Sequence, residues 1–139
     1  MKVVTGTPPN YKEILKVFPQ LEKDKRVVFC YGDTIYAPGG ARGITPDLEA
    51  HEAVHMRQQV YGWLGTGPKR WWKKYLKDPK FRLEQELEAY RAQYQFYKEV
   101  VSDDRNKVNA LLLKIAGHLS GPIYGNLIST SEAVKLIKK

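Results

Sequence analysis

The chain has 139 residues, of which 42% are hydrophobic and 27% are charged, so a largely disordered protein is excluded and one domain with one core is expected. Its single cysteine, Cys30, excludes a disulfide framework and a cysteine-rich zinc finger. The net charge of +8 permits acidic partners, nucleic acid included.

No segment reaches the ~18 consecutive apolar residues of a membrane span. The first residues also lack the apolar core of a secretory signal. We therefore expect a cytoplasmic protein that does not bind membranes.

In chain order, the first half of the sequence predicts a short helix capped by Asn10, then a β-hairpin, then a longer helix. The hairpin is predicted by two β-rich runs, 27–31 and 34–36, on either side of the turn Gly32-Asp33. Thr45-Pro46-Asp47 supplies an N-cap, a proline at the first helical position and an acid in the first turn, so the longer helix should run to about residue 62.

Four further helices are predicted in the second half. They are 68–76, 81–101, one capped by Ser102 that ends at Gly121-Pro122, and a short one opened by the capping box Ser129–Glu132. In the helix 81–101, one apolar stripe repeats at spacings of four and three: Leu83, Leu87, Tyr90, Tyr94 and Tyr97. The sequence therefore predicts a mainly helical α+β fold, residues 1–139 forming a single domain with a small hairpin before its second helix.

The most informative motif is His51-Glu52-Ala53-Val54-His55. On a helix, His51 and His55 lie one turn apart on the same face, where they can share a metal ion. Glu52 is rotated by about 100° from His51, which suits a general base for a metal-bound water. The alternative is a pair of core histidines with hydrogen-bond partners.

A catalytic zinc ion needs a third protein ligand, and a carboxylate is the expected type. The helix 81–101 offers Glu84, Glu86 and Glu88. Glu86 lies about 60° from the centre of the apolar stripe, against about 100° for Glu84 and about 140° for Glu88. This geometry favours Glu86, while a solvated position on the helix flank remains the alternative.

These residues resemble the zincin metallopeptidases of the gluzincin type, in which H-E-x-x-H is followed by a helical Glu-x-x-Ala. The matching segments are His51-Glu52-x-x-His55 and Glu86-Leu87-Glu88-Ala89. The resemblance implies a minimal zincin-like fold, one Zn²⁺ held by His51, His55 and Glu86, and water activation by Glu52. Relatives often carry Asp or Asn four residues after the ligand Glu, supporting a histidine. Here that position is Tyr90, so this support is expected from another residue.

A wider resemblance joins the chain to small uncharacterised zincin-like proteins of bacteriophages, which implies a phage-infected bacterial host. It is carried by Ile35-Tyr36-Ala37-Pro38, His-Glu-x-x-His-x-x-Gln-Gln and Trp71-Trp72-x-x-Tyr75.

Peptide hydrolysis would use further groups. The resemblance to zincins, which generally place a strand beside the cleft, implies an edge to which an extended peptide substrate can add, and the hairpin that ends at Tyr36 is the candidate for it. Oxyanion or supporting roles are open to Tyr90, His118, Tyr124 and, on the histidine face, Gln58, each with a purely structural role as the alternative.

The segment 69–82 holds seven basic residues and one acid, and so carries +6 of the net +8. Its cations and its aromatic rings, Trp71, Trp72 and Tyr75, predict either a nucleic-acid-binding surface or an amphipathic helix with its rings in the core. The second interpretation is favoured.

Three functions follow as hypotheses. The first is a zinc metallopeptidase that acts on a protein or peptide substrate. The second is a non-catalytic, zinc-stabilised structural or binding protein. The third is a protease that acts on DNA-bound proteins and is anchored by residues 69–82.

Overall fold

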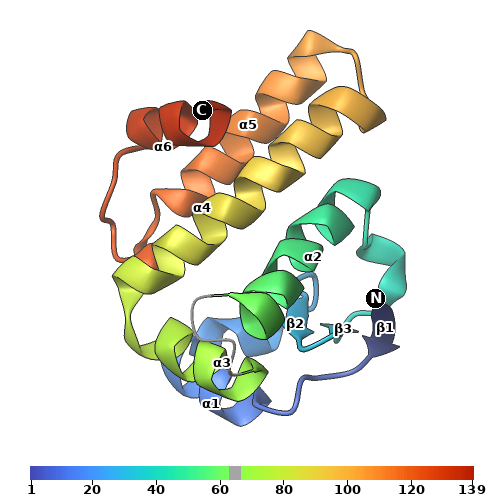
Figure 1. The fold of residues 1–139 in the computed structure, drawn as a ribbon, viewed down its shortest axis with the longest axis vertical. Helices are drawn as coiled ribbons and strands as arrows, with labels where there is room; N and C mark the ends of the chain where they lie inside the picture. The colour runs from blue at the N-terminus through green and yellow to red at the C-terminus, as the bar shows by residue number, and fades with distance from the viewer. Residues whose placement is uncertain (63–66) are drawn as a thin grey trace.

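The computed structural model describes residues 1–62 and 67–139 (Figure 1). Its helices are α1 (Tyr11–Val17), α2 (Pro46–Tyr61), α3 (Pro68–Lys77), α4 (Pro79–Phe96), α5 (Arg105–Leu119) and α6 (Thr130–Lys138). Its strands are β1 (Lys2–Thr5), β2 (Phe29–Tyr31) and β3 (Thr34–Ala37). A π-helical turn, Tyr97–Val101, extends α4. The predicted mainly helical α+β fold, with a hairpin before the second helix, is confirmed.

The helix starts follow local capping chemistry. The Thr45 side chain accepts a hydrogen bond from the backbone N–H of Leu48, and Pro46 is the first residue of α2. Ser129 and Glu132 form the predicted capping box of α6. Asn10 is the N-cap residue of α1 as predicted, although its side chain makes no capping hydrogen bond. The predicted cap at Ser102 is wrong, because Asp104 caps α5 and its carboxylate accepts from the N–H of Asn106.

The sheet has the strand order β1-β3-β2, with β1 parallel and β2 antiparallel to β3. Gly32, in the hairpin turn, has φ +63°, a value that favours glycine. The sequence did not predict β1, which pairs with β3 from Lys2 opposite Thr34 to Thr5 opposite Ala37. The strand that ends with Ala37 is therefore central in the sheet, so this strand of the predicted hairpin has no free edge for a substrate.

The outer edge of β2 is also in use. The backbone carbonyl of Cys30 accepts from the side chains of Gln59 on α2 and Trp72 on α3. The Gln59 amide oxygen also accepts from the N–H of Gly32. These bonds fasten the hairpin to the two helices, and they leave the outer side of β1 as the edge that no described strand covers.

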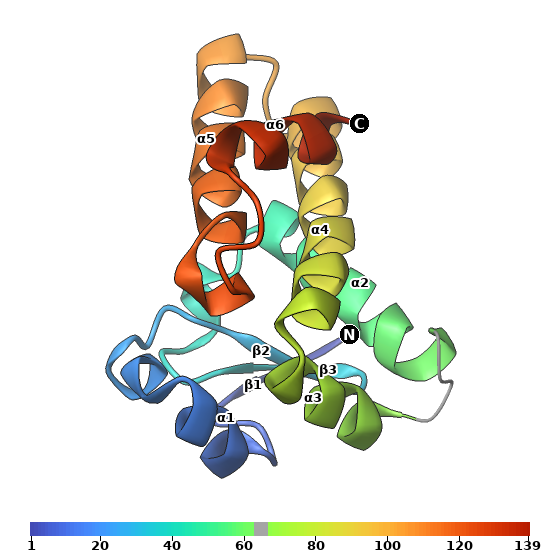
Figure 2. The ribbon, with the colours of Figure 1, turned by 90° about the vertical axis from the view of Figure 1, so that its left-hand side faces the viewer.

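Two apolar clusters hold the fold together, and α4 reaches both. One lies among α4, α5 and α6, which Figure 2 shows side by side, and includes Tyr94, Leu112 and Leu119. The other includes Ile14 of α1, Trp71 of α3 and Phe81 at the start of α4. The long helix α4 is thus packed into the core at both ends, and this packing holds the backbone in place under the side chains in its middle.

Helix α4 buries two faces rather than one. The predicted apolar stripe is only partly buried except at Tyr94, and it packs towards α5 and α6. A second, polar stripe is more deeply buried: Arg82, Glu86 and Gln93 are 5%, 6% and 7% exposed. Glu86 and Gln93 bond side chains of α2. Among the described residues, no helix combines the length and the apolar character needed to cross a bilayer.

Candidate metal centre

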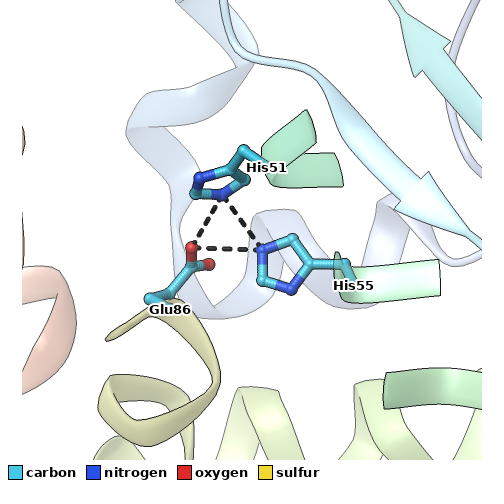
Figure 3. A group of neighbouring side chains, drawn as sticks. All are labelled: His51, His55 and Glu86. Carbon is cyan, nitrogen blue, oxygen red and sulfur yellow. Dashed lines mark hydrogen bonds and ion pairs between the residues drawn. The ribbon is translucent and has the colours of Figure 1, made fainter. Parts of the chain in front are cut away.

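Three side chains from α2 and α4 converge at one point (Figure 3). His51 Nε2 and His55 Nε2 lie 3.1 Å apart, and each lies 3.1 Å from Glu86 Oε1. A tetrahedral zinc ion with bonds of about 2.0–2.1 Å to its ligands has ligand–ligand edges of about 3.3–3.4 Å. The triangle is therefore close to one face of such a tetrahedron. All three side chains are buried, with exposed fractions of 5–6%.

Both imidazole rings are held from behind by glutamine amides. His51 Nδ1 lies 3.0 Å from Gln93 Oε1, and His55 Nδ1 lies 2.8 Å from Gln58 Oε1. An amide oxygen can only accept, so each Nδ1 carries the proton and donates. In the neutral rings, the lone pairs then lie on the two Nε2 atoms that face Glu86.

The carboxylate of Glu86 is held in the same way. Its Oε2 accepts a hydrogen bond of 2.5 Å from the Tyr75 hydroxyl, which leaves Oε1 for the histidines. Burial raises the pKa of Glu86, but the charges and hydrogen bonds of His55 and His51 outweigh it and hold that pKa well below its usual range. Burial likewise lowers the pKa of His55, yet the Glu86 charge prevails and raises it to about 9.

The arrangement fits a metal cation. Three acceptor atoms 3.1 Å apart repel one another unless protons or a positive ion lie between them. With each Nδ1 proton donated to a glutamine, a cation satisfies all three atoms together, whereas neutral rings alone leave the Nε2 atoms unpaired. His51, His55 and Glu86 therefore form a buried triad that could hold a metal ion, and their donor atoms by themselves do not identify the metal.

Glu52 lies beside this triad and is 5% exposed. Burial raises its pKa, against a lowering by His51 and His55, and Glu86 adds to the rise. Among the described residues, no group donates a hydrogen bond to its carboxylate. A buried carboxylate that accepts no hydrogen bond binds a proton more readily than an exposed one. This property suits the role of general base that the sequence predicts for Glu52.

Two of the remaining candidate residues lie close to the triad as well. The Tyr90 ring packs edge-on against the His51 ring, with 4.6 Å between the centroids. Tyr124 is buried, and its pKa is raised well above the usual value by burial and by Glu86, Tyr90 and Tyr75. Burial and Glu86 also raise the pKa of Tyr90, so both hydroxyls stay protonated.

The other candidates lie elsewhere. His118 is exposed near the end of α5, and no described contact joins it to the triad. Partial burial and Lys114 lower the pKa of His118, so the imidazolium is not favoured there. Glu84 and Glu88 are exposed. Of the three glutamates considered as third ligand, only Glu86 faces the histidines.

Three residues that support the triad were not predicted as site residues: Asp47, Tyr75 and Gln93. Gln93 Nε2 donates to Asp47 Oδ2 at 2.9 Å, which continues the hydrogen-bond chain behind His51. The spacing could have indicated two of them. Asp47 precedes His51 by one helical turn and Gln93 follows Glu86 by two turns, so each lies on the same helix face as a proposed ligand. The resemblance implies that a histidine is supported from the position of Tyr90. Here the hydrogen bond to His51 comes instead from Gln93, three residues later.

The basic segment 69–82 forms α3 and the start of α4, and it turns its rings inward. Trp71, Trp72 and Tyr75 are 5–8% exposed, and the Trp71 indole N–H donates to Gln85 Oε1. The interpretation as an amphipathic helix with its rings in the core is confirmed, and these rings cannot stack on bases. Arg82 is also internal, because its guanidinium donates to the backbone carbonyls of Tyr75, Leu76 and Ile123.

A surface hollow of about 310 Å³ lies between the end of α2 and α4. Its lining residues are Arg57, Gln58, Tyr61, Gly62, Gln85 and Glu88. Gln58 donates to the Gln85 carbonyl at 3.0 Å, so this pair separates the hollow from His55. None of the three triad residues, His51, His55 and Glu86, lines this hollow.

Comparison with known proteins returned no match: no family model fits the chain, and no curated protein or solved structure gives a significant similarity.

Proposed function

We propose that the protein is a zinc-dependent hydrolase of peptide bonds. The observation that carries this proposal is the buried triangle of His51 Nε2, His55 Nε2 and Glu86 Oε1, with the buried carboxylate of Glu52 beside it, to which no described residue donates a hydrogen bond. Two imidazoles and one carboxylate are a ligand set that zinc takes in catalytic sites, where a fourth position stays open. The adjacent proton acceptor supports a catalytic site rather than a closed structural one.

Each residue has a defined role in the proposed reaction. Zinc, when bound, would supply a Lewis acid that acidifies water and polarises a carbonyl group. Glu52 takes a proton from the attacking water and passes it to the leaving amine. Tyr75 holds the Glu86 carboxylate so that one oxygen faces the histidines. The protonated hydroxyls of Tyr90 and Tyr124 are the candidate donors to the oxyanion.

The experiment compares wild type with Glu52→Gln, using zinc-loaded protein and a peptide library. We expect the variant to bind zinc as wild type does and to lose hydrolysis by about 10²-fold or more, because the proton acceptor is gone. Glu88→Gln is the matched control, since Glu88 is an exposed carboxylate on α4. Full activity of Glu52→Gln would contradict the proposed role.

A second function, a non-catalytic protein stabilised by zinc, is favoured by one specific observation. The edge of β3 that a substrate would pair with is taken by β1, and Cys30 on the outer edge of β2 is bonded to helix side chains. If wild type binds zinc, gains thermal stability from it and cleaves no peptide of the library, this second function replaces the first.

A further inference from the structure

The side chains behind His51 form a directed chain of hydrogen bonds. Gln93 Oε1 lies 3.0 Å from His51 Nδ1, and Gln93 Nε2 donates to Asp47 Oδ2 at 2.9 Å. All three residues are buried, with exposed fractions of 5–7%. We propose that Asp47, acting through the amide of Gln93, fixes the tautomer in which His51 presents Nε2 to the metal. This inference rests on the proposed metal site.

The direction of the chain follows from which groups can donate. An ionised carboxylate only accepts, so the NH₂ group of Gln93 must face Asp47 and its oxygen must face His51. The Nδ1 atom of His51 then has to carry the proton, and the lone pair of the neutral ring is on Nε2. If the amide turned round, its NH₂ group would face Nδ1, Nε2 would carry the proton, and this ring could not bind a metal.

The glutamine behind His51 can be released by mutation, whereas the glutamine behind His55 cannot. The amide of Gln58 is oriented by donation to the backbone carbonyl of Gln85, which no substitution removes. Behind His51, the group that accepts from the glutamine is the side chain of Asp47, which lies 46 residues before Gln93 in the sequence and can be substituted. Asp47 touches no metal-binding atom in the structure. It is therefore a positioning residue, and its effect on the metal has to pass through Gln93.

Asp47 can also stabilise α2 itself, and a test must separate this effect from its hydrogen bond to Gln93. It lies in the first turn of α2, where an acid stabilises the helix through the helix dipole. Glu49 is the matched control, because it is an acid in the same first turn, is exposed, and takes no part in the chain behind His51.

The test uses Asp47→Asn, Glu49→Gln and the double variant Asp47→Asn/Gln93→Glu, with zinc affinity measured by competition with a chelator. An asparagine at position 47 can donate or accept, so Gln93 is free to turn, and we expect zinc affinity to fall about 10- to 100-fold. The double variant places the carboxylate next to His51 and the amide behind it. That carboxylate again accepts from Nδ1, so we expect affinity within about 3-fold of wild type. Glu49→Gln should bind zinc as wild type does.

A second readout does not depend on the metal. In the metal-free protein, at a pH where the ring is neutral, ¹⁵N NMR of the His51 ring should show the proton on Nδ1 in wild type and in the double variant. In Asp47→Asn, a mixture of tautomers is expected. This readout separates the two proposals, because a wild type that binds no zinc but shows the Nδ1 proton contradicts the proposed function alone.

Three results would overturn the inference. Asp47→Asn could retain wild-type zinc affinity, its His51 tautomer could be unchanged, or the double variant could fail to recover the lost affinity. If Asp47→Asn does not fold, the folded double variant still tests the inference through its tautomer and its zinc affinity.

Discussion

Glu86 and Glu88 lie two residues apart on α4, yet of the two only Glu86 contacts the histidines of α2. Its Oε1 lies 3.1 Å from both histidine Nε2 atoms, whereas Glu88 is exposed and lines the surface hollow. Chemically identical groups thus have different roles because of a rotation of about 200° around one helix.

This difference gives the first prediction. Glu86→Ala removes one of three ligands, and we expect zinc affinity to fall by more than about 100-fold, beyond the usual cost of losing a supporting hydrogen bond. Glu88→Ala should change zinc affinity little. Both values can be measured by competition with a chromogenic chelator. The reverse order of effects would show that Glu88 is the ligand.

The protonation of His55 gives the second prediction. Without metal, Glu86 raises the pKa of His55 to about 9, so at neutral pH the ring carries a proton that a metal must displace. We expect zinc affinity to rise about tenfold per pH unit up to about pH 9, as measured by chelator competition. An affinity that does not vary with pH over this range would contradict the assigned pairing.

The same shift determines how the metal-free protein responds to pH. The pKa of His55 is higher in the folded state than the ordinary value of 6.5, so its pairing with Glu86 stabilises the fold below that value. That contribution is lost as the pH rises through about 9. Melting of the metal-free protein should therefore show a loss of stability over this interval that Glu86→Gln lacks.

At the scale of elements, the sequence predicted those parts of the fold that local chemistry determines. Thr45 and Pro46 define the start of α2, and the capping box at Ser129 defines that of α6. Strand β1 was missed because its four residues are all exposed and show no alternation of apolar and polar side chains. Only pairing with β3 makes it a strand.

The part of the site that local spacing determines was also predicted. His51, Glu52 and His55 stand within one helical turn, so their spacing alone brings them together. Of the buried polar face of α4 only Glu86 was predicted to lie inward, since polar residues at helical spacing ordinarily indicate a solvated flank. Asp47 and Gln93 meet only because α2 packs against α4.

The third prediction concerns the exposed cations of α3. Lys73 and Lys77 lie on the solvent side of the helix, while the rings beneath them are buried. We expect any DNA binding by this segment to be purely electrostatic, without preference for sequence or for single strands, because the rings of Trp71, Trp72 and Tyr75 are buried and cannot stack on a base. Fluorescence anisotropy at several salt concentrations measures this. Lys73→Glu/Lys77→Glu should lower the salt slope by about 2, whereas Lys12→Glu/Lys16→Glu on α1 should not.

At the scale of the whole molecule, the triad joins α2 to α4, the helix that takes part in both apolar clusters. A metal bound there links the sheet-bearing half of the molecule to the bundle of α4, α5 and α6 (Figure 2). Metal binding should therefore stabilise the fold as a whole rather than one loop.

Removal of the metal gives the fourth prediction. Free zinc at about 1,000 times its Kd stabilises a folded protein by ~4 kcal/mol, which for a chain of this size raises Tm by about 10–20 °C. Differential scanning calorimetry with and without a chelator should show this difference. Glu86→Ala is the control, since its Tm should respond little to the chelator.

Metal analysis by mass spectrometry tests whether His51, His55 and Glu86 hold one zinc ion, as we propose. Protein purified without added metal should contain about one zinc per chain, and Glu86→Ala, prepared in parallel, should contain far less. A wild-type content below about 0.2 zinc per chain that added zinc does not restore would contradict the account.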